Sequence, residues 1–317
     1  MRLLITGGAG FIGSHLADRA LARGWTVAVI DDLSSGRRDN VPAAAEFLQI
    51  DIRDSDAVNH AFAAFRPTAV AHQAAQASVA VSVREPQHDA AINITGSLNI
   101  LTAAVAHDVS RIVFASTGGA IYGEVPDGTR AGVSFNPVPI SPYACSKFAV
   151  EKYLECFRVE HGLNYTVLRY ANVYGPRQDP HGEAGVVAIF CNRILAGESI
   201  QINARRSAGD DGCVRDYVYI EDVVKANIAA LEGNVPEPIL NVGTGQETTT
   251  RQLADILQQK LDRNVEVRPS DRRPGDIERS LLDADRLEEL LGPVTTIGDG
   301  LAATASWFQQ RLGSPAS

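Results

Sequence analysis

The 317-residue sequence lacks the patterns that mark membrane spans, disulfide frameworks and metal centres. It contains two tryptophans and four cysteines, and no apolar run approaches the roughly eighteen residues of a membrane-spanning helix. Cys145, Cys156, Cys191 and Cys213 show no C-x-x-C spacing, which favours free thiols over a disulfide framework. The seven histidines are scattered without a second ligand at metal spacing, so we expect no metal site.

Positive charge is also in the minority. The chain has 29 lysines and arginines against 38 aspartates and glutamates, a net charge of −9, which argues against nucleic acid or an anionic membrane as the main partner. The apolar segment at the start is too short for a signal peptide and runs straight into a glycine-rich turn. We therefore expect a cytoplasmic protein.

Strand and helix patterns alternate through the first half of the chain. Apolar strands are expected over residues 3–5, 26–30, 45–50, 69–72, 111–116 and 166–169, with helices over 11–23, 54–65, 91–107 and from 144 onward. This alternation predicts an α/β fold, a Rossmann-type doubly wound parallel sheet, covering residues 1–170. Proline and glycine become frequent afterwards, which indicates a smaller, interleaved α/β substrate-binding lobe over 171–317, with the segment 217–242 returning to the first domain.

A glycine-rich turn joins the first expected strand to the first expected helix. Residues 6–13 read T-G-G-A-G-F-I-G and contain a G-x-G-x-x-G pattern. Glycines here allow a tight turn and let the backbone approach a pyrophosphate at the helix N-terminus. The turn therefore predicts a dinucleotide site, with contacts from Gly7, Gly10, Phe11, Ile12 and Gly13.

Asp31 ends the second strand, about twenty residues after this turn. Its carboxylate is placed to accept hydrogen bonds from ribose hydroxyls and repels a 2′-phosphate, which favours NAD over NADP. Arg37 and Arg38 follow closely and leave NADP as the alternative. Asp51 and Ile52, after the third strand, are expected near the adenine, although Asp51 taken alone also fits an ordinary loop acid.

The segment 141–147, S-P-Y-A-C-S-K, combines a helix start with a phenol and an ammonium. Ser141 suits the cap and Pro142 the first turn, so Tyr143 and Lys147 at i and i+4 share one face, roughly 5 to 6 Å apart at Cβ. A cation beside a tyrosine favours the phenolate, so the pair can act as a base. The alternative is an ordinary pair on a helix surface.

Together with the strand-end Ser116 and Thr117, these motifs resemble the extended short-chain dehydrogenase/reductase superfamily, and within it the bacterial UDP-glucose 4-epimerases. The resemblance covers nearly the whole chain. It includes, in the family's order, Asn93, A-N-V-Y-G-P at 171–176, R-D-Y at 215–217, N-V-G-T-G at 241–245 and R-P-G-D at 273–276.

The resemblance implies roles for individual residues. Tyr143 would take the proton from the sugar 4-hydroxyl while hydride leaves carbon 4 for NAD, and Lys147 would lower the tyrosine pKa and hold the nicotinamide ribose. Thr117 would hydrogen-bond the reacting oxygen, but the turn at 116–123 is one residue longer than usual, so Ser116 stays open as the contacting hydroxyl. The family pattern adds Asp32, Gln73 and Asn93 to the cofactor contacts.

The same resemblance implies a substrate site. Arg215 and Arg273 would clamp the UDP pyrophosphate, with Asn172, Asn203 and Asp276 as further substrate contacts. Ser280 falls where a bulky side chain closes the sugar pocket of some epimerases, so we expect N-acetylated UDP-hexoses to be accepted as well. Gly118 and Gly119 replace the Asp-Glu pair of the related dehydratases, which excludes their elimination chemistry.

The sequence therefore predicts an NAD-dependent epimerase acting at carbon 4 of a UDP-hexose. A UDP-glucuronate 4-epimerase or another sugar-nucleotide oxidoreductase is the alternative enzyme. A non-catalytic dinucleotide-sensing protein on the same fold is the alternative of another class, since a fold does not fix a function. The family leads us to expect a homodimer formed through the helices at 91–107 and 144–161.

Overall fold

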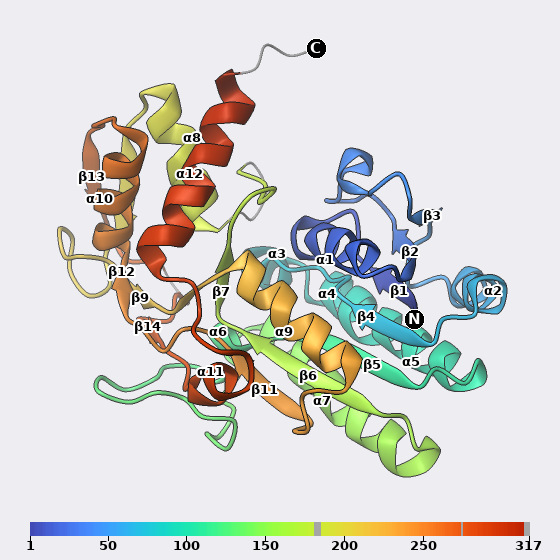
Figure 1. The fold of residues 1–317 in the computed structure, drawn as a ribbon. Helices are drawn as coiled ribbons and strands as arrows, with labels where there is room; N and C mark the ends of the chain where they lie inside the picture. Colours follow the sequence, from blue (N-terminus) through green and yellow to red (C-terminus); the bar gives the residue numbers. More distant parts are fainter. Residues whose placement is uncertain (181–184, 274, 314–317) are drawn as a thin grey trace. The chain divides into compact units, whose positions relative to one another are not determined.

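The computed structural model describes residues 1–180, 185–273 and 275–313, which form two compact units (Figure 1). Unit 1 contains Met1–Thr117, Pro139–Arg169 and Val223–Leu240. Unit 2 contains Gly118–Val138, Tyr170–Asp222 and the described part of 241–317. The chain therefore passes repeatedly between the two units, and each unit is assembled from three separate segments.

Residues 118–138 differ from the sequence expectation, which assigned them to the first domain. In the structure they cluster with unit 2 because their polar groups find partners there. The Glu124 carboxylate accepts the amides of Glu278 and Arg279, at 2.8 and 2.7 Å. The Asn241 side chain donates to the Ala131 carbonyl at 2.8 Å. These bonds fix the loop that follows the fifth strand to the distant carboxyl-terminal part of the chain.

A seven-stranded parallel sheet forms the centre of unit 1, with the strand order β11-β6-β5-β4-β1-β2-β3. Its strands are β1 (Arg2–Thr6), β2 (Thr26–Asp31), β3 (Glu46–Gln49), β4 (Ala69–His72), β5 (Arg111–Thr117), β6 (Tyr165–Tyr170) and β11 (Ile239–Val242). Most of their residues are buried aliphatics, as expected for strands covered on both faces. The predicted Rossmann-type fold is confirmed.

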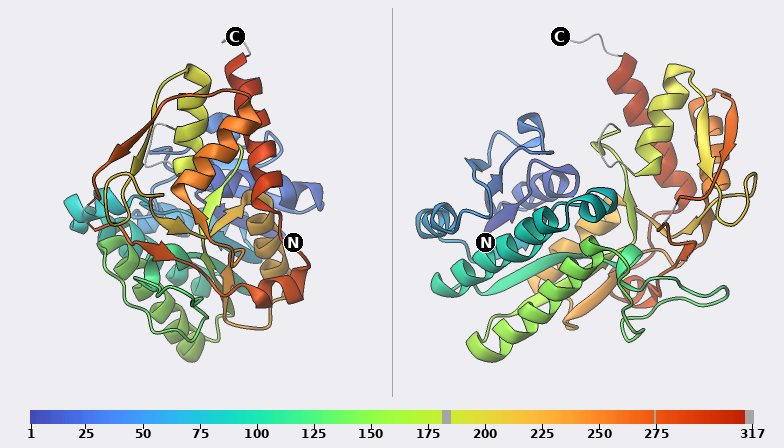
Figure 2. Two further views of the ribbon diagram at one scale, coloured as in Figure 1. Left: turned by 90° about the vertical axis from the view of Figure 1, so that its left-hand side faces the viewer. Right: turned by 180° about the vertical axis from the view of Figure 1, so that it is seen from behind.

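Helices cover both faces of this sheet (Figures 1 and 2). One face carries α2 (Ser55–Phe65), α5 (Ser97–Ala106) and α7 (Pro142–His161), whose apolar residues share one core with the strands. The other carries α1 (Phe11–Ala22) and α9 (Ile220–Glu232), joined by an Arg23–Glu232 ion pair. Short elements complete the unit: η1 (Arg38–Asn40), α3 (Val79–Arg84), α4 (Pro86–Ala90) and the π-helix η2 (Ala91–Gly96).

The carboxyl ends of the central strands meet at one edge of the sheet. Thr6 of β1 stands beside Ile30 of β2 on one side and His72 of β4 on the other, and His72 stands beside Phe114 of β5. The strand order reverses between β1 and β4. Ligands of open parallel sheets bind at such a switch point, outside the carboxyl ends of the strands.

Unit 2 contains short strands and three longer helices. Its elements are α6 (Gly118–Ile121), β7 (Asn172–Tyr174), α8 (Val186–Ala196), β8 (Ile200–Asn203), β9 (Val214–Arg215), β10 (Tyr217–Tyr219), β12 (Thr248–Thr249), α10 (Thr250–Leu261), β13 (Val267–Ser270), β14 (Arg279–Ser280), α11 (Asp285–Leu291) and α12 (Ile297–Gly313). Residues 217–242 only partly return to the large sheet. β11 joins its edge, whereas β10 pairs with β7 in a separate two-stranded sheet.

One helix prediction is wrong in detail. Residues 91–107 were expected to form one helix, but the structure has the π-helix η2 before α5. The wider turn lies where Gly96 faces the side chain of Ile52, and a Cβ at residue 96 would lie only 2.6 Å from the Ile52 Cγ1. Apolar periodicity in the sequence does not distinguish such a wide turn from an ordinary α-helical one. Turns of this π-helical kind commonly lie at functional sites.

The structure adds two findings about the described residues. None of its helices is long and apolar enough to cross a membrane. The same residues contain no cluster of three or more His, Cys, Asp or Glu side chains that could hold a metal ion.

Candidate active site

The glycine turn after β1 has the close packing that a dinucleotide site requires. Gly7 adopts φ +69°, and a Cβ there would lie 2.6 Å from the Ala74 backbone nitrogen. A Cβ at Gly13 would collide with the Gly7 carbonyl oxygen. Gly10 is the N-cap of α1, and Phe11 and Ile12 open that helix, so free N–H groups face the turn. The turn thus fits a pyrophosphate at the helix N-terminus.

Asp31 lies at the end of β2, where its carboxylate is held by the backbone. Oδ2 accepts the Ala9 amide at 3.0 Å and Oδ1 accepts the Leu33 amide at 2.9 Å. Burial raises the pKa of Asp31, and the two backbone hydrogen bonds oppose this rise. The neighbouring Asp32 accepts the Ser34 amide and hydroxyl. A carboxylate fixed beside the glycine turn fits the ribose of NAD and disfavours a 2′-phosphate.

Asp51 and Ile52 follow β3 in the loop before α2. Asp51 forms an ion pair with Arg53, which lowers the pKa of Asp51. Ile52 is buried, and its carbonyl accepts the Asn99 side chain at 2.9 Å. The backbone of this loop is therefore fixed to α5, while Ile52 supplies an apolar surface.

The loop after β4 contains Gln73 and is fastened by Asn93 of η2. The Asn93 amide donates to the Gln76 carbonyl at 2.9 Å, and its oxygen accepts the Gln76 amide at 3.0 Å. Gln73 donates to Asn227 of α9 at 3.0 Å. Asn93 is buried, so its present role is to hold the loop at the carboxyl end of β4.

Tyr143 and Lys147 begin α7, which starts as the sequence predicts. The Ser141 hydroxyl accepts the Ala144 amide and Pro142 occupies the first turn. The Lys147 ammonium donates to the Ala115 carbonyl of β5 at 2.9 Å and lies 4.8 Å from the centroid of the Phe114 ring. Lys147 is buried, with 3% of its surface exposed. Lys147 is therefore not an exposed residue of the helix surface, which was the alternative interpretation of the pair.

The structure distinguishes the two hydroxyls at the end of β5. Thr117 interacts with Tyr143 and lowers the pKa of its hydroxyl. Ser116 donates instead to Glu151 of α7 at 2.6 Å, and Glu151 forms a buried ion pair with Arg169 of β6. Glu151 and Arg169 each expose only 2% of their side chains. The geometry therefore favours Thr117 as the hydroxyl beside the base and gives Ser116 a structural bond.

Burial dominates the acid–base properties of the pair. It raises the pKa of Tyr143 to about 12 and lowers the pKa of Lys147 to about 8. Asp89 raises both values, and the Thr117 hydrogen bond lowers that of Tyr143. The sequence led us to expect a lowered tyrosine pKa. The protein surroundings alone give the opposite direction, so the phenolate requires a further positive charge close by.

The chain is similar in sequence and fold to proteins of a known family. The model of the NAD dependent epimerase/dehydratase family matches residues 3–243. The chain belongs to this family. The UDP-glucose 4-epimerase of Mycolicibacterium smegmatis is 42% identical to this chain over 319 residues, which cover 98% of this chain and 99% of the relative.

Two solved structures show the same fold as this epimerase-family chain. The Thermus thermophilus UDP-glucose 4-epimerase in complex with NAD is 51% identical, covers 98% of this chain and 99% of its own, and has a TM-score of 0.94. The Thermotoga maritima UDP-glucose 4-epimerase with UDP-glucose is 46% identical, covers 98% and 100%, and has a TM-score of 0.91.

Thr117 and Tyr143 lie in unit 1, and the other substrate residues expected from the family, Asn172, Asn203, Arg215, Arg273, Asp276 and Ser280, all lie in unit 2. Arg215 of β9 stands beside Ser280 of β14 in register, and its guanidinium donates to the Val214 carbonyl at 3.0 Å. Asn172 opens β7 and donates to the Asp216 carbonyl at 3.1 Å. Asn203 ends β8, in a different two-stranded sheet. Unit 2 thus brings Arg215 and Ser280 together and places Asn203 on another element.

Arg273 and Asp276 lie in the loop before β14. Arg273 is exposed, and its carbonyl accepts the Asp276 amide at 3.3 Å. Pro274, between them, lies outside the described residues. The loop leads into Arg279, which is buried and donates to Glu247 and to the carbonyls of Val125 and Thr129. Arg279 therefore fixes the strand that carries Ser280.

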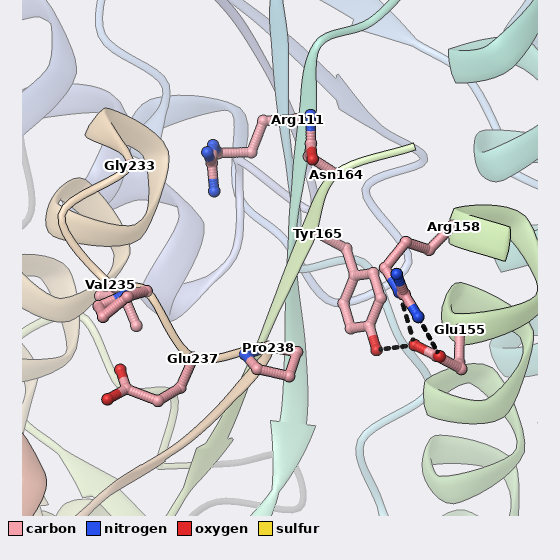
Figure 3. A pocket seen from close by; sticks show the side chains of 10 residues that line it. Arg111, Glu155, Arg158, Asn164, Tyr165, Gly233, Val235, Glu237 and Pro238 are labelled. Carbon is pink, nitrogen blue, oxygen red and sulfur yellow. Dashed lines mark hydrogen bonds and ion pairs between the residues drawn. The ribbon is translucent and has the colours of Figure 1, made fainter. Parts of the chain in front are cut away.

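A separate cavity of about 450 Å³ lies within unit 1, at the amino-terminal edge of the sheet (Figure 3). It is lined by Arg111, Glu155, Arg158, Asn164, Tyr165, Gly233, Val235, Pro236, Glu237 and Pro238. Glu155 accepts both Arg158 and the Tyr165 hydroxyl, so these side chains form one cluster on its wall. The cavity is at the opposite end of the strands from Thr117. Its two arginines are balanced by two glutamates, and we assign it no part in the chemistry.

Several residues of the candidate active site were missed by sequence reasoning. Glu151 follows Lys147 by four residues, and this spacing indicates that the two residues share one face of the helix. Arg169 is a charge inside an otherwise apolar strand pattern, and such a residue needs a buried partner. Asp89, buried next to α7, gives no comparable signal in the sequence.

Proposed function

We propose that this protein is an NAD-dependent UDP-hexose 4-epimerase that interconverts UDP-glucose and UDP-galactose through a transient 4-keto sugar. The observation that carries the proposal is the buried Lys147 ammonium, fixed by the Ala115 carbonyl one helical turn after Tyr143, in the same unit as the glycine turn and Asp31. The Thermotoga maritima relative with UDP-glucose supports the choice of substrate class.

The proposed chemistry is a reversible oxidation at carbon 4. NAD, when bound, supplies the acceptor and later the donor of the hydride. Gly7, Gly10, Phe11, Ile12 and Gly13 would hold its pyrophosphate. Its remaining contacts would come from Asp31, Asp32, Asp51, Ile52, Gln73 and Asn93.

Tyr143 would remove the proton from the sugar 4-hydroxyl and return it on the opposite face of the ring. Because burial raises the pKa of Tyr143, its phenolate depends on the positive charge of Lys147 and on that of the oxidised cofactor. Thr117 would orient the reacting oxygen. Lys147 is held by the Ala115 carbonyl, which fixes its ammonium near the base.

The UDP part would bind to unit 2. Arg215 and Arg273 would hold the pyrophosphate, because a guanidinium can form paired bonds to phosphate oxygens. Asn172, Asn203 and Asp276 would contribute further substrate contacts. Ser280 would leave space beside the sugar for an N-acetyl group.

A UDP-sugar panel without added NAD tests the function. Inversion at carbon 4 is followed by NMR with UDP-glucose, UDP-galactose and UDP-glucuronate. We expect conversion of the first two, since the purified protein would retain its cofactor. Conversion of UDP-glucuronate alone would replace the proposal by the alternative enzyme, and NAD binding without any conversion would favour a sensing protein.

Substitution of the base tests the mechanism. Tyr143→Phe is expected to lower kcat by about 10²-fold or more, while NAD binding is preserved. Tyr153→Phe is the matched control, because Tyr153 lies on the same helix with 41% of its surface exposed. Equal activity of the two variants would contradict the assignment of Tyr143.

We further propose a cytoplasmic homodimer. The four cysteines are free, as is usual in a reducing compartment. The dimer would form through α5 and α7, and α7 exposes Val159, which is a candidate for a contact face. Sedimentation should give twice the chain mass of 33.9 kDa, and a single-chain mass would contradict the dimer.

A further inference from the structure

Asp89 of α4 is a fully buried carboxyl group next to the catalytic helix, and the mechanism above does not use it. Its Oδ1 accepts the side-chain amides of Gln76 and Asn93, both at 2.9 Å. Its Oδ2 accepts the Ser146 hydroxyl at 2.6 Å. Ser146 lies directly before Lys147 in α7. The carboxyl group therefore links the loop after β4, the π-helix η2 and the start of α7.

The three side chains that contact the Asp89 carboxylate, Gln76, Asn93 and Ser146, all donate hydrogen bonds to it. An amide N–H cannot accept a hydrogen bond, so the two amides on Oδ1 leave no place for a proton there. Hydrogen bonds donated to a carboxylate stabilise the ion. Within the described residues, no arginine or lysine nitrogen forms an ion pair with Asp89. Its negative charge is therefore not cancelled locally, and it acts on Tyr143 and Lys147 through space.

Other titratable groups near the pair contribute little net charge. His72 of β4 is buried between Thr6 and Ser97, and burial lowers its pKa to about 3, so it is neutral. Glu151, further along α7, is paired with Arg169 of β6. Asp89 is thus the one uncompensated charge that acts on both Tyr143 and Lys147 among the described groups.

We propose that Asp89 is a positioning residue that acts through Tyr143 and Lys147: its buried charge sets their protonation, and its hydrogen bonds fix the start of α7. This inference rests on the proposed function. A nearby negative charge favours the protonated form of both a tyrosine and a lysine. Asp89 therefore keeps the Lys147 ammonium charged in spite of its burial, and the same charge makes the Tyr143 phenolate harder to form.

The consequence is a characteristic pH profile. In the holoenzyme, where the positive charge of NAD also lowers the pKa of Tyr143, activity should rise with pH as Tyr143 loses its proton and fall as Lys147 loses its charge. Removing the Asp89 charge should move both limbs of the kcat/KM profile to lower pH, by about one unit or more. A defect in packing alone would lower activity at every pH without moving the limbs.

Asp89→Asn is the informative variant, because it removes the charge and keeps the shape. The asparagine oxygen can still accept Gln76 and Asn93, and its NH₂ group can donate to Ser146, whose hydroxyl turns to accept. Ser146→Ala is the matched control, since it deletes one hydrogen bond and keeps the charge. Both are measured as holoenzymes with added NAD and UDP-galactose between pH 6 and 10, with thermal unfolding recorded alongside.

We expect both limbs of the kcat/KM profile to move to lower pH in Asp89→Asn and to keep their positions in Ser146→Ala. Unmoved limbs in Asp89→Asn, or an equal movement in Ser146→Ala, would overturn the inference. If Asp89→Asn does not fold, Asp89→Ser replaces it, because the smaller side chain leaves room for water between the same donors. The same movement of both limbs to lower pH is then expected. Failure of the proposed function is distinguishable, because the wild-type protein would then not convert UDP-galactose at all.

Discussion

The α7 helix offers a direct comparison of a buried and an exposed ion pair. Glu151 pairs with Arg169, and both side chains are 2% exposed. Glu155, one turn later, pairs with Arg158, and these side chains are 46% and 51% exposed. Glu151→Ala would leave the Arg169 guanidinium buried without its carboxylate and would remove the acceptor of the Ser116 hydroxyl. Breaking such a pair typically lowers the free energy of unfolding by about 3 to 5 kcal/mol.

The assay is equilibrium unfolding in urea, followed by circular dichroism, for the wild type, Glu151→Ala and Glu155→Ala. Glu155→Ala should change the midpoint only slightly, because water screens and solvates exposed charges. The double variant Glu151→Leu/Arg169→Met should recover most of the stability, since it leaves no buried charge unpaired. Similar midpoints for Glu151→Ala and Glu155→Ala would refute this reasoning, and so would a double variant as unstable as Glu151→Ala.

Three further predictions concern the cofactor turn, a buried histidine and the substrate range. Gly13→Ala should abolish NAD binding in calorimetry, because the added methyl group collides with the Gly7 carbonyl; normal affinity would mean that the turn relaxes freely. His72, with its pKa lowered to about 3, stays neutral in the folded state while the unfolded chain takes up a proton below pH 6.5. When the pH is lowered from 6 to 4, the free energy of unfolding of the wild type should therefore fall faster than that of His72→Asn, by about 1.4 kcal/mol for each pH unit. Urea unfolding at each pH measures both, and equal slopes for the two proteins would contradict the prediction. Ser280 is small and buried, so UDP-GalNAc should be converted as well as UDP-galactose, and its rejection at high enzyme concentration would show that other residues close the pocket.

Local patterns were sufficient to predict most of the large sheet. Strand β4 has the predicted bounds, and α7 begins at the predicted cap and proline, because apolar periodicity and capping act within a few residues. The glycine turn and Asp31 could also be located, since their spacing follows directly from a strand, a turn and a helix.

The remaining features depend on contacts between distant segments. The hydrogen bond that engages Ser116 comes from contact with Glu151, which is thirty-five residues away and is not indicated by any local pattern. Likewise, the sequence does not reveal that the Glu124 carboxylate accepts hydrogen bonds from the amides of Glu278 and Arg279. The direction of the Tyr143 pKa was predicted wrongly, because burial and the charge of Asp89, neither of which the local pattern reveals, raise it.

The interleaving of the chain has a consequence for synthesis. Strand β11 closes one edge of the large sheet, yet Val223–Leu240 follows two of the three segments of unit 2 along the chain. A growing polypeptide emerges from the amino terminus, so β6 remains an open edge until Ile239–Val242 has been made. Truncation anywhere before Leu240 would leave that edge unpaired, and edges of this kind invite aggregation. Neither unit can be obtained as one continuous fragment, and unit 1 is complete only after two of the three segments of unit 2 have been synthesised.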